Sequence, residues 1–346
     1  MEPVVHFDSP SDIPSSLGTS LSGSPRPPGA GGVAVAAIFV GLVTLLYAGQ
    51  RARVFSATNP ARYRTVSASA RPPASAAPSH RTFSAPLTDE DAARLRALPP
   101  QDQAEELLER SLAHDERARQ MLDDNVGEWT GHLRRTPRLS RLDARAQYST
   151  DLRVRFSDAA LCLALEGWHR NEESAGLLTS RAQGDPKYRA YAVYYLGMLA
   201  GQGVAYDRIH SVLLNYALED SDAAVRQWAV EGLRFLRKDE VLDELFASFT
   251  HDASLSVRDR AACNLAEGGH FTRAQRMRLV PRLIEVAGDP ATTAQMRNWS
   301  FLALTEITGQ RISPDAAVWA GWYREQGAAK LAQFQSQPWW QVAGDE

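Results

Sequence analysis

The segment from Asp185 to Leu304 decides the fold, because one short pattern returns in it four times. An apolar or aromatic residue precedes an Arg, a small residue lies three positions after that Arg, and a Leu lies four positions after the small residue. The copies read Asp185-Pro186-Lys187-Tyr188-Arg189 with Ala192 and Leu196, Asp222-Ala223-Ala224-Val225-Arg226 with Ala229 and Leu233, Val257-Arg258 with Ala261 and Leu265, and Met296-Arg297 with Ser300 and Leu304. A fainter copy precedes them at Asp151-Leu152-Arg153-Val154-Arg155. The arginines at 155, 189, 226, 258 and 297 are 34, 37, 32 and 39 residues apart, which is typical of a solenoid.

Each copy predicts the first part of an amphipathic helix, because its apolar positions fall on one helical stripe. An Asp ahead of the helix can cap it, and Asp185-Pro186 and Asp289-Pro290 have the order expected for an N-cap followed by the first helical residue. A second amphipathic segment follows each signature helix, over 205–217, 239–249 and 273–286. The sequence therefore predicts two-helix repeats, each of which buries its apolar face against the next.

The Asp–apolar–Arg–x–x–Ala–x–x–x–Leu pattern resembles HEAT repeats, in the short bacterial form also found in phycobilisome-lyase-type proteins, over about residues 150–326. The Trp, Leu-Gly and Tyr pattern of the tetratricopeptide repeat is not in register. The segment from Leu304 to Gln310, with Trp319 and Trp322 after it, is similar to the end of uncharacterised membrane-anchored bacterial HEAT-repeat proteins. The resemblance implies an all-α fold, namely an α-α superhelix (HEAT-type solenoid). Composition adds one transmembrane helix and a disordered linker before it.

The N-terminal part of the chain predicts a membrane anchor. Residues 1–29 are rich in Ser, Pro and Gly and are expected to be a disordered tail. Residues 30–50 carry no charge and are close to the length of a transmembrane helix. A cleaved signal peptide or a buried core helix are the alternatives; a basic leader and a small-residue cleavage site, which a signal peptide needs, are missing. Residues 51–87 read as a Pro/Ala/Ser-rich flexible linker.

The charges beside residues 30–50 predict the orientation. Arg51, Arg53, Arg62 and Arg64 follow the segment, whereas only Arg26 precedes it. The positive-inside rule then keeps the C-terminal domain in the cytoplasm of a bacterium, with the anchor in its inner (cytoplasmic) membrane. A periplasmic or other extracytoplasmic location is the alternative, since such tethers also suit proteins outside the membrane.

The remaining boundaries follow from helical patterns. Residues 88–148 predict an N-terminal helical cap, because the first repeat needs its open apolar side covered. The repeat solenoid is expected over 149–328, with Trp319 and Trp322 covering its last repeat, and a tail over 329–346. In the tail, Trp339 and Trp340 are a candidate aromatic anchor for a partner, although docking back onto the final helices is favoured over that role.

The sequence contains no motif that predicts catalysis, a cofactor or a metal ion. Cys162 and Cys263 fall in separate repeat helices and read as small core residues, and the eight His do not cluster at metal-ligand spacing. No Gly-x-Ser-x-Gly, Walker or EF-hand pattern is present. Residues 1–87 hold three of the 41 acidic and seven of the 38 basic residues, so the remainder carries 38 acidic and 31 basic residues, a net charge of −7. This charge argues against a nucleic-acid partner.

The resemblance implies that the second helix of each repeat lines a concave, partner-binding face. The polar side chains expected to project from this face are Arg208, Ser211, Asn215, Glu240, Asp243, Glu244, Gln275, Arg278 and Arg282. Their charge would pass from mixed to acidic to basic, a pattern that can fix the register of a protein partner. A merely solvated face is the equal alternative.

Together these observations predict a membrane-anchored, non-catalytic HEAT-repeat scaffold for protein–protein interaction. The alternatives are a HEAT-like enzyme, either a chromophore lyase or a DNA glycosylase, and a structural component of an envelope assembly. A glycosylase would need a basic, aromatic-lined groove, which the net charge opposes. The partner's identity does not follow from the sequence.

Overall fold

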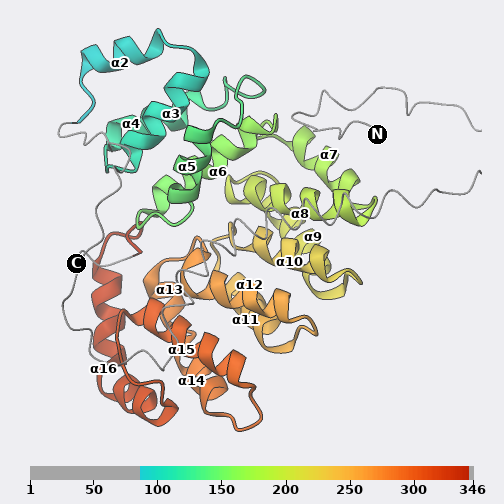
Figure 1. Ribbon diagram of the computed structural model, residues 1–346, viewed down its shortest axis with the longest axis vertical. Coiled ribbons are helices and arrows are strands. Elements are labelled where there is room, and N and C mark those ends of the chain that lie inside the picture. Colours follow the sequence, from blue (N-terminus) through green and yellow to red (C-terminus); the bar gives the residue numbers. More distant parts are fainter. Residues whose placement is uncertain (1–85, 343–346) are drawn as a thin grey trace, which may run out of the picture. The chain divides into compact units, whose positions relative to one another are not determined.

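The computed structural model describes residues 86–342, which form helices joined by short loops (Figure 1). The helices are α2 (Asp89–Arg96), α3 (Pro100–Ser111), α4 (Glu116–Asn125), α5 (Pro137–Ala146), α6 (Leu152–Leu165), α7 (Glu172–Ala182), α8 (Pro186–Gly201), α9 (Tyr206–Glu219), α10 (Ala223–Leu233), α11 (Asp239–His251), α12 (Leu255–Cys263), the π-helix η5 (Asn264–Gly268), α13 (Arg273–Met277), α14 (Val280–Gly288), α15 (Ala294–Thr308) and α16 (Ala316–Ser336). The expected all-α architecture is confirmed for this part of the chain.

The predicted tail (1–29), the predicted membrane helix (30–50) and nearly all of the predicted linker (51–87) lie outside the described residues. Between residues 86 and 342, no helix combines the length and the apolar character that crossing a bilayer requires.

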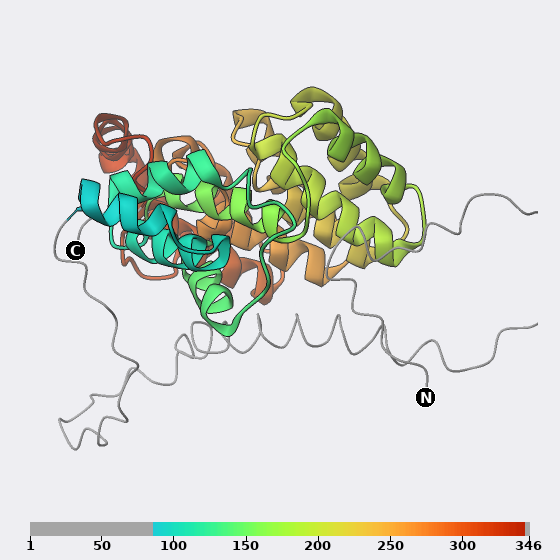
Figure 2. The same cartoon turned by 90° about the horizontal axis from the view of Figure 1, so that it is seen from above.

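The repeats form two layers of helices, which follow one another in sequence order (Figures 1 and 2). We define the first layer as the signature helices α6, α8, α10, α12 and α15, and the second layer as α7, α9, α11, α13 and α14. Neighbouring helices of the first layer pack closely, α8 against α10 above all, whereas α7, α9 and α11 barely touch one another. The first layer is therefore the more closely packed of the two, and the expectation that the second helices line a concave face stays a prediction.

Two glycines explain the close approach of α8 and α10. Gly197 lies on α8 directly against Gly232 of α10, and a Cβ at Gly197 would overlap the Gly232 backbone. A Cβ at Gly232 would lie 2.7 Å from the carbonyl oxygen of Val193. Only glycine lets the two backbones touch here, so these residues set the spacing of the first layer.

The recurring Arg has a structural role that is the same in every repeat. Arg155 donates to the carbonyl of Ser149, and Arg226 to that of Asp220, six residues upstream in each case, at 2.7 and 2.8 Å. Arg189 and Arg258 make equivalent contacts with Gly184 and Asp252. The guanidinium thus binds the loop that leads into its own helix, which explains why the residue recurs.

Acidic residues connect two of these arginines to the next repeat. Arg189 pairs with Asp220 at 2.5 Å, and Arg226 pairs with Asp252 at 2.8 Å. Hydrogen bonds from these arginines to the aspartates raise the pKa of both guanidinium groups. The aspartates accept from backbone amides as well, since Asp220 binds the amide of Asp222 and Asp252 that of Ser254. Each aspartate therefore holds two consecutive repeats in register.

Both ends of the array are covered. Apolar side chains of α2 to α5 share one core with Val154, Ala160 and Leu161 of α6. At the other end α16 packs on α13 and α14, and Trp319 is fully buried with its ring 5.7 Å from that of Trp322. Helix α16 continues to Ser336, past the predicted end of the solenoid at residue 328.

Two local predictions are wrong. The helix expected over 273–286 is divided into α13 and α14, because Pro281 lacks an N–H and restricts the residue before it, so a new helix begins at Val280. Asp289 is the C-cap of α14, and α15 is capped by Thr293, whose hydroxyl accepts from the amide of Met296. The caps predicted at Asp151, Asp185 and Asp222 are present.

Candidate functional site

The polar residues predicted for a partner-binding face lie on successive elements of the second layer. Arg208, Ser211 and Asn215 are on α9, and Glu240, Asp243 and Glu244 are on α11. Gln275 is on α13, Arg278 follows it as the C-cap, and Arg282 is on α14. The fold therefore brings them together as one surface, which we call the second-layer surface.

The charged side chains of the second-layer surface are largely paired with one another. Asp243 lies 3.0 Å from Arg278 and 2.5 Å from Arg282. Arg208 lies 2.5 Å from Glu172 on α7. Exposed pairs of this kind contribute about 0–1 kcal/mol each to the free energy of unfolding. Their larger effect is to cancel the local fields that would attract a charged partner.

One pair on this surface is half-buried. Glu244 accepts from Nε2 of His210 at 2.8 Å, and both side chains are 17% exposed. Burial raises the pKa of Glu244, and the contact with His210 opposes that shift. This pair joins α9 to α11, so its first role is to hold two second-layer helices together.

A groove of about 260 Å³ lies between α7 and α9. Its lining residues are Thr179, Gln183, Ser211, Val212, Asn215 and Tyr216. The Tyr216 hydroxyl donates to the carbonyl of Ala182 at 2.7 Å, and the Arg208–Glu172 pair also joins the two helices. The groove exists because α7 and α9 stand apart while α8 and α10 touch. Two of the predicted residues, Ser211 and Asn215, line it.

The C-terminal tail binds back onto the array. The amide of Leu152 donates to the carbonyl of Trp340 at 2.7 Å, and the amide of Val342 donates to Thr150 at 2.8 Å. The Arg153 guanidinium lies 3.9 Å from the Trp340 ring centre. Docking back is thus observed, but at the start of α6 and not on the final helices. The ring of Trp339 remains 53% exposed.

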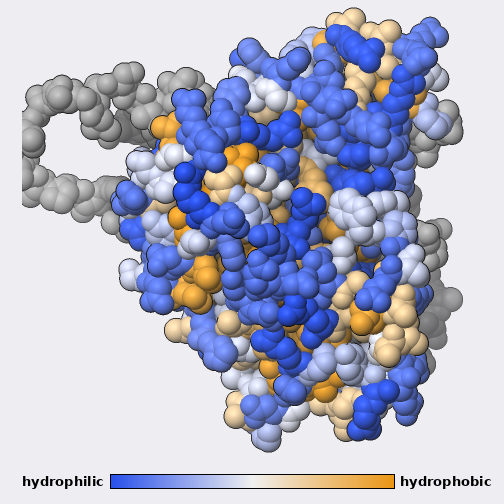
Figure 3. Space-filling view, turned by 180° about the vertical axis from the view of Figure 1, so that it is seen from behind, coloured by the Kyte–Doolittle hydropathy of each residue, from blue (hydrophilic) through white to orange (hydrophobic). Residues whose placement is uncertain are grey.

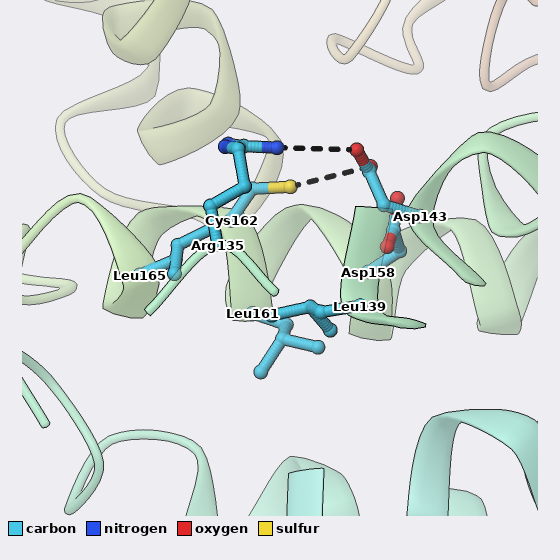
Figure 4. Close-up of a pocket in the computed structure, with 7 residues that line it drawn as sticks. All are labelled: Arg135, Leu139, Asp143, Asp158, Leu161, Cys162 and Leu165. Carbon is cyan, nitrogen blue, oxygen red and sulfur yellow. Dashed lines mark hydrogen bonds and ion pairs between the residues drawn. The ribbon is translucent and has the colours of Figure 1, made fainter. Parts of the chain in front are cut away.

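A second site, which we call the α5–α6 cluster, consists of Arg135, Asp143, Asp158 and Cys162 around a small cavity of about 10 Å³ (Figure 4). Asp158 and Cys162 are one turn apart on α6 and so share a face. Asp143 faces them from α5: its Oδ1 lies 3.6 Å from the Cys162 sulfur. Arg135 lies 3.5 Å from Asp143 and 3.2 Å from Glu166.

Burial makes the α5–α6 cluster chemically unusual. It raises the pKa of Asp158 well above its usual range, and the neighbouring Asp143 raises it further. The pKa of the Cys162 thiol is raised for the same two reasons, burial first and Asp143 second. Both shifts favour the protonated forms of Asp158 and Cys162.

The described surface has no broad apolar face in the view of Figure 3, where hydrophilic side chains predominate and apolar ones form small, separate patches. The exposed large hydrophobic residues are Leu177, Tyr188, Leu218, Leu255, Val318 and Trp339. On this face a partner would therefore contact mixed surface, as in most non-obligate complexes.

Comparison with known proteins agrees with the two-layer repeat geometry. Residues 174–266 match the family model for HEAT repeats. This segment is similar to HEAT repeats. It contains the α7–α9 groove, α11 and the close contact between α8 and α10, and HEAT repeats generally bind other proteins. No curated protein and no solved structure matches the chain.

The sequence predicted some of these residues and missed others. The second-layer surface followed from the repeat pattern, and two of its members line a groove in the HEAT segment. Thr179 on α7 and Gln183, its C-cap, were missed because they lie ahead of the first clear signature. The α5–α6 cluster was missed as well, although one signal was present: Asp158 is an acidic residue directly before the apolar run from Ala159 to Leu165.

Proposed function

We propose that this protein is a membrane-anchored, non-catalytic scaffold whose HEAT-repeat array binds a protein partner. The observation that carries the proposal is the α7–α9 groove, which lies inside the HEAT segment and is lined by side chains with free access from solvent. HEAT repeats supply extended surfaces for other proteins, and the second layer is the side on which this array is open.

The chemistry of the groove specifies the partner. Val212 and the ring of Tyr216 provide apolar surface, while Thr179, Ser211 and Asn215 provide hydrogen-bonding groups at the rim. A peptide segment that inserts one apolar side chain and presents backbone N–H and C=O groups to the rim satisfies both. Because the nearby charges are already paired, we expect recognition by shape and hydrogen bonds more than by charge.

The membrane part of the proposal rests on residues 30–50, with residues 51–87 as the tether. A tether raises the effective concentration of a bound partner near the bilayer. We place the anchor in the inner membrane of a bacterium and the HEAT array on its cytoplasmic side, from the excess of Arg after residue 50.

Ser211→Trp tests partner binding, because its indole would fill the α7–α9 groove without touching the core: Ser211 is exposed. The matched control is Ser256→Trp, an exposed Ser on α12 outside the groove. Proteins crosslinked to the full-length chain in its native membranes are compared by mass spectrometry. We expect one partner set to be lost in Ser211→Trp and kept in Ser256→Trp. Identical sets in both variants would remove the groove from the proposal.

The anchor is tested in the same cells. The full-length chain is expected to sediment with membranes and a variant lacking residues 30–50 to stay in the supernatant. A C-terminal tag protected from protease in spheroplasts supports the cytoplasmic orientation, and cleavage of the tag there places the array on the other side.

A further inference from the structure

The α5–α6 cluster combines three metal-ligand side chains with a cavity of atomic size. One ligand atom each from Asp143, Asp158 and Cys162 lie within 4.8 Å of one another, and all three residues line a cavity of about 10 Å³. That volume is close to the minimum for one water molecule. The cavity therefore accommodates one small ligand and no organic substrate.

An independent observation points to a ligand in this cavity. Asp158 is 3% exposed, and its Oδ1 has no hydrogen-bond partner in the structure. A buried polar atom without a partner costs about 1–3 kcal/mol, so folded proteins rarely keep one unless something binds it. Because Asp158 lines the cavity, a bound species there would satisfy this oxygen (Figure 4).

We propose that Asp143, Asp158 and Cys162 bind one Zn²⁺ ion, with a water molecule as the fourth ligand. A thiolate with two carboxylate oxygens is a donor set that suits Zn²⁺ and disfavours Mg²⁺ and Ca²⁺, which prefer oxygen alone. Ligand atoms around tetrahedral Zn²⁺ stand roughly 3.3–3.8 Å apart, given bonds of about 2.0–2.3 Å. The Cys162–Asp143 distance of 3.6 Å already fits, and small side-chain rotations bring in Asp158.

Binding is balanced in atoms and charge. The Cys162 thiol and the Asp158 carboxyl each release a proton to solvent as S–Zn and O–Zn bonds form. The two new negative charges offset the Zn²⁺ charge. Arg135 lies at the mouth of the site with its side chain 47% exposed, and it retains Glu166 as a partner at 3.2 Å when Asp143 turns to the metal.

The ion would join α5 of the N-terminal cap to α6, the first helix of the array. Its role is then structural, since three protein ligands in a cavity of this size leave no room for a substrate. This inference does not depend on the proposed scaffold function.

Titration of the metal-free, full-length chain with Co²⁺ tests the site, because Co²⁺ replaces Zn²⁺ and reports thiolate ligation by a charge-transfer absorption band. We expect one equivalent to bind with that band and to be displaced by Zn²⁺. Cys162→Ser should abolish the band, whereas Cys263→Ser, which removes the other cysteine, should leave it unchanged. Asp158→Asn should weaken binding by about tenfold or more.

Three results would overturn the inference: no saturable Co²⁺ binding, which would leave a water molecule as the occupant; binding without the thiolate band; or a band that survives Cys162→Ser. Folding does not confuse the outcome, because Asp158→Asn removes a buried ionisable group and circular dichroism verifies that each variant remains helical.

Discussion

The two layers of the repeat array differ in how closely their helices pack, above all where α8 meets α10. In the first layer, Gly197 and Gly232 let α8 and α10 touch, and the pairs Arg189–Asp220 and Arg226–Asp252 each connect one repeat to the next. In the second layer the helices stand apart and are linked mainly by exposed ion pairs. The comparison shows that one layer holds the repeats together, while the other is available for binding. Three substitutions test this difference.

The largest effect is expected at the contact between α8 and α10. Gly197→Ala places a Cβ against the Gly232 backbone and forces the two helices apart, so we expect the free energy of unfolding to fall by about 3 kcal/mol or more. Gly176→Ala, on α7 of the second layer, meets no atom within 4 Å and should raise it by roughly 0.5–1 kcal/mol through helix propensity. Urea denaturation measures both. Similar losses in the two variants would contradict the distinction between the layers.

A smaller effect is expected from the acidic residues that link successive repeats. Asp252→Ala leaves the Arg226 guanidinium, which is 13% exposed, without its carboxylate, and should cost about 2–3 kcal/mol. Asp207→Ala removes the exposed partner of Lys238 in the second layer and should change stability by less than about 1 kcal/mol. Thermal unfolding of the two variants measures the difference. An equal change in Tm would show that the Arg226–Asp252 pair stabilises the fold no more than the exposed Lys238–Asp207 pair does.

The smallest effect at neutral pH, and one that grows in acid, is expected at His270. This ring is 2% exposed and lies edge-on to Phe156 and Phe235 at 5.0 and 4.9 Å. Burial, with Arg234 and other arginines nearby, lowers its pKa well below the usual value. The folded protein therefore keeps His270 neutral, whereas the unfolded chain binds a proton below about pH 6.5.

This difference in proton binding fixes the direction of the pH dependence. The contribution of neutral His270 to the free energy of unfolding is complete above the unfolded pKa. It is lost as the pH falls below about 6.5, at about 1.4 kcal/mol per pH unit. His270→Phe should remove this part of the acid sensitivity, and His251→Phe, an exposed control on α11, should not. Urea denaturation at a series of pH values between 7.5 and roughly 5 measures the slope. Parallel slopes for wild type and His270→Phe would show that His270 does not titrate with folding.

Much of this architecture was predictable because it depends on local patterns. The spacing of Arg226, Ala229 and Leu233 predicts a buried helical stripe, and Asp222 ahead of it predicts the N-cap that the structure shows. The capping box at Thr88 and Asp91 was predictable for the same reason. These features involve residues three or four apart, whose geometry the helix itself fixes.

The local errors have an equally local cause. Pro281 was overlooked inside an amphipathic pattern, and the pattern alone predicted one helix where the structure has α13 and α14. The order Asp289-Pro290 predicts an N-cap for the next helix, but Thr293, four residues later, takes that role and α15 begins at Ala294. Sequence order alone does not rank two capping candidates that lie so close together.

By itself the sequence determined the repeat, its period, most helix starts and the residues of the second-layer surface. Tertiary structure alone decided which layer is the more closely packed, that Ser211 and Asn215 line a groove, and that Trp340 docks beside Leu152. It also brought Asp143 on α5 to Asp158 and Cys162 on α6. The physical reason is that periodicity fixes which face of a helix is buried, whereas the distance between helices depends on the side chains of both, as Gly197 and Gly232 demonstrate.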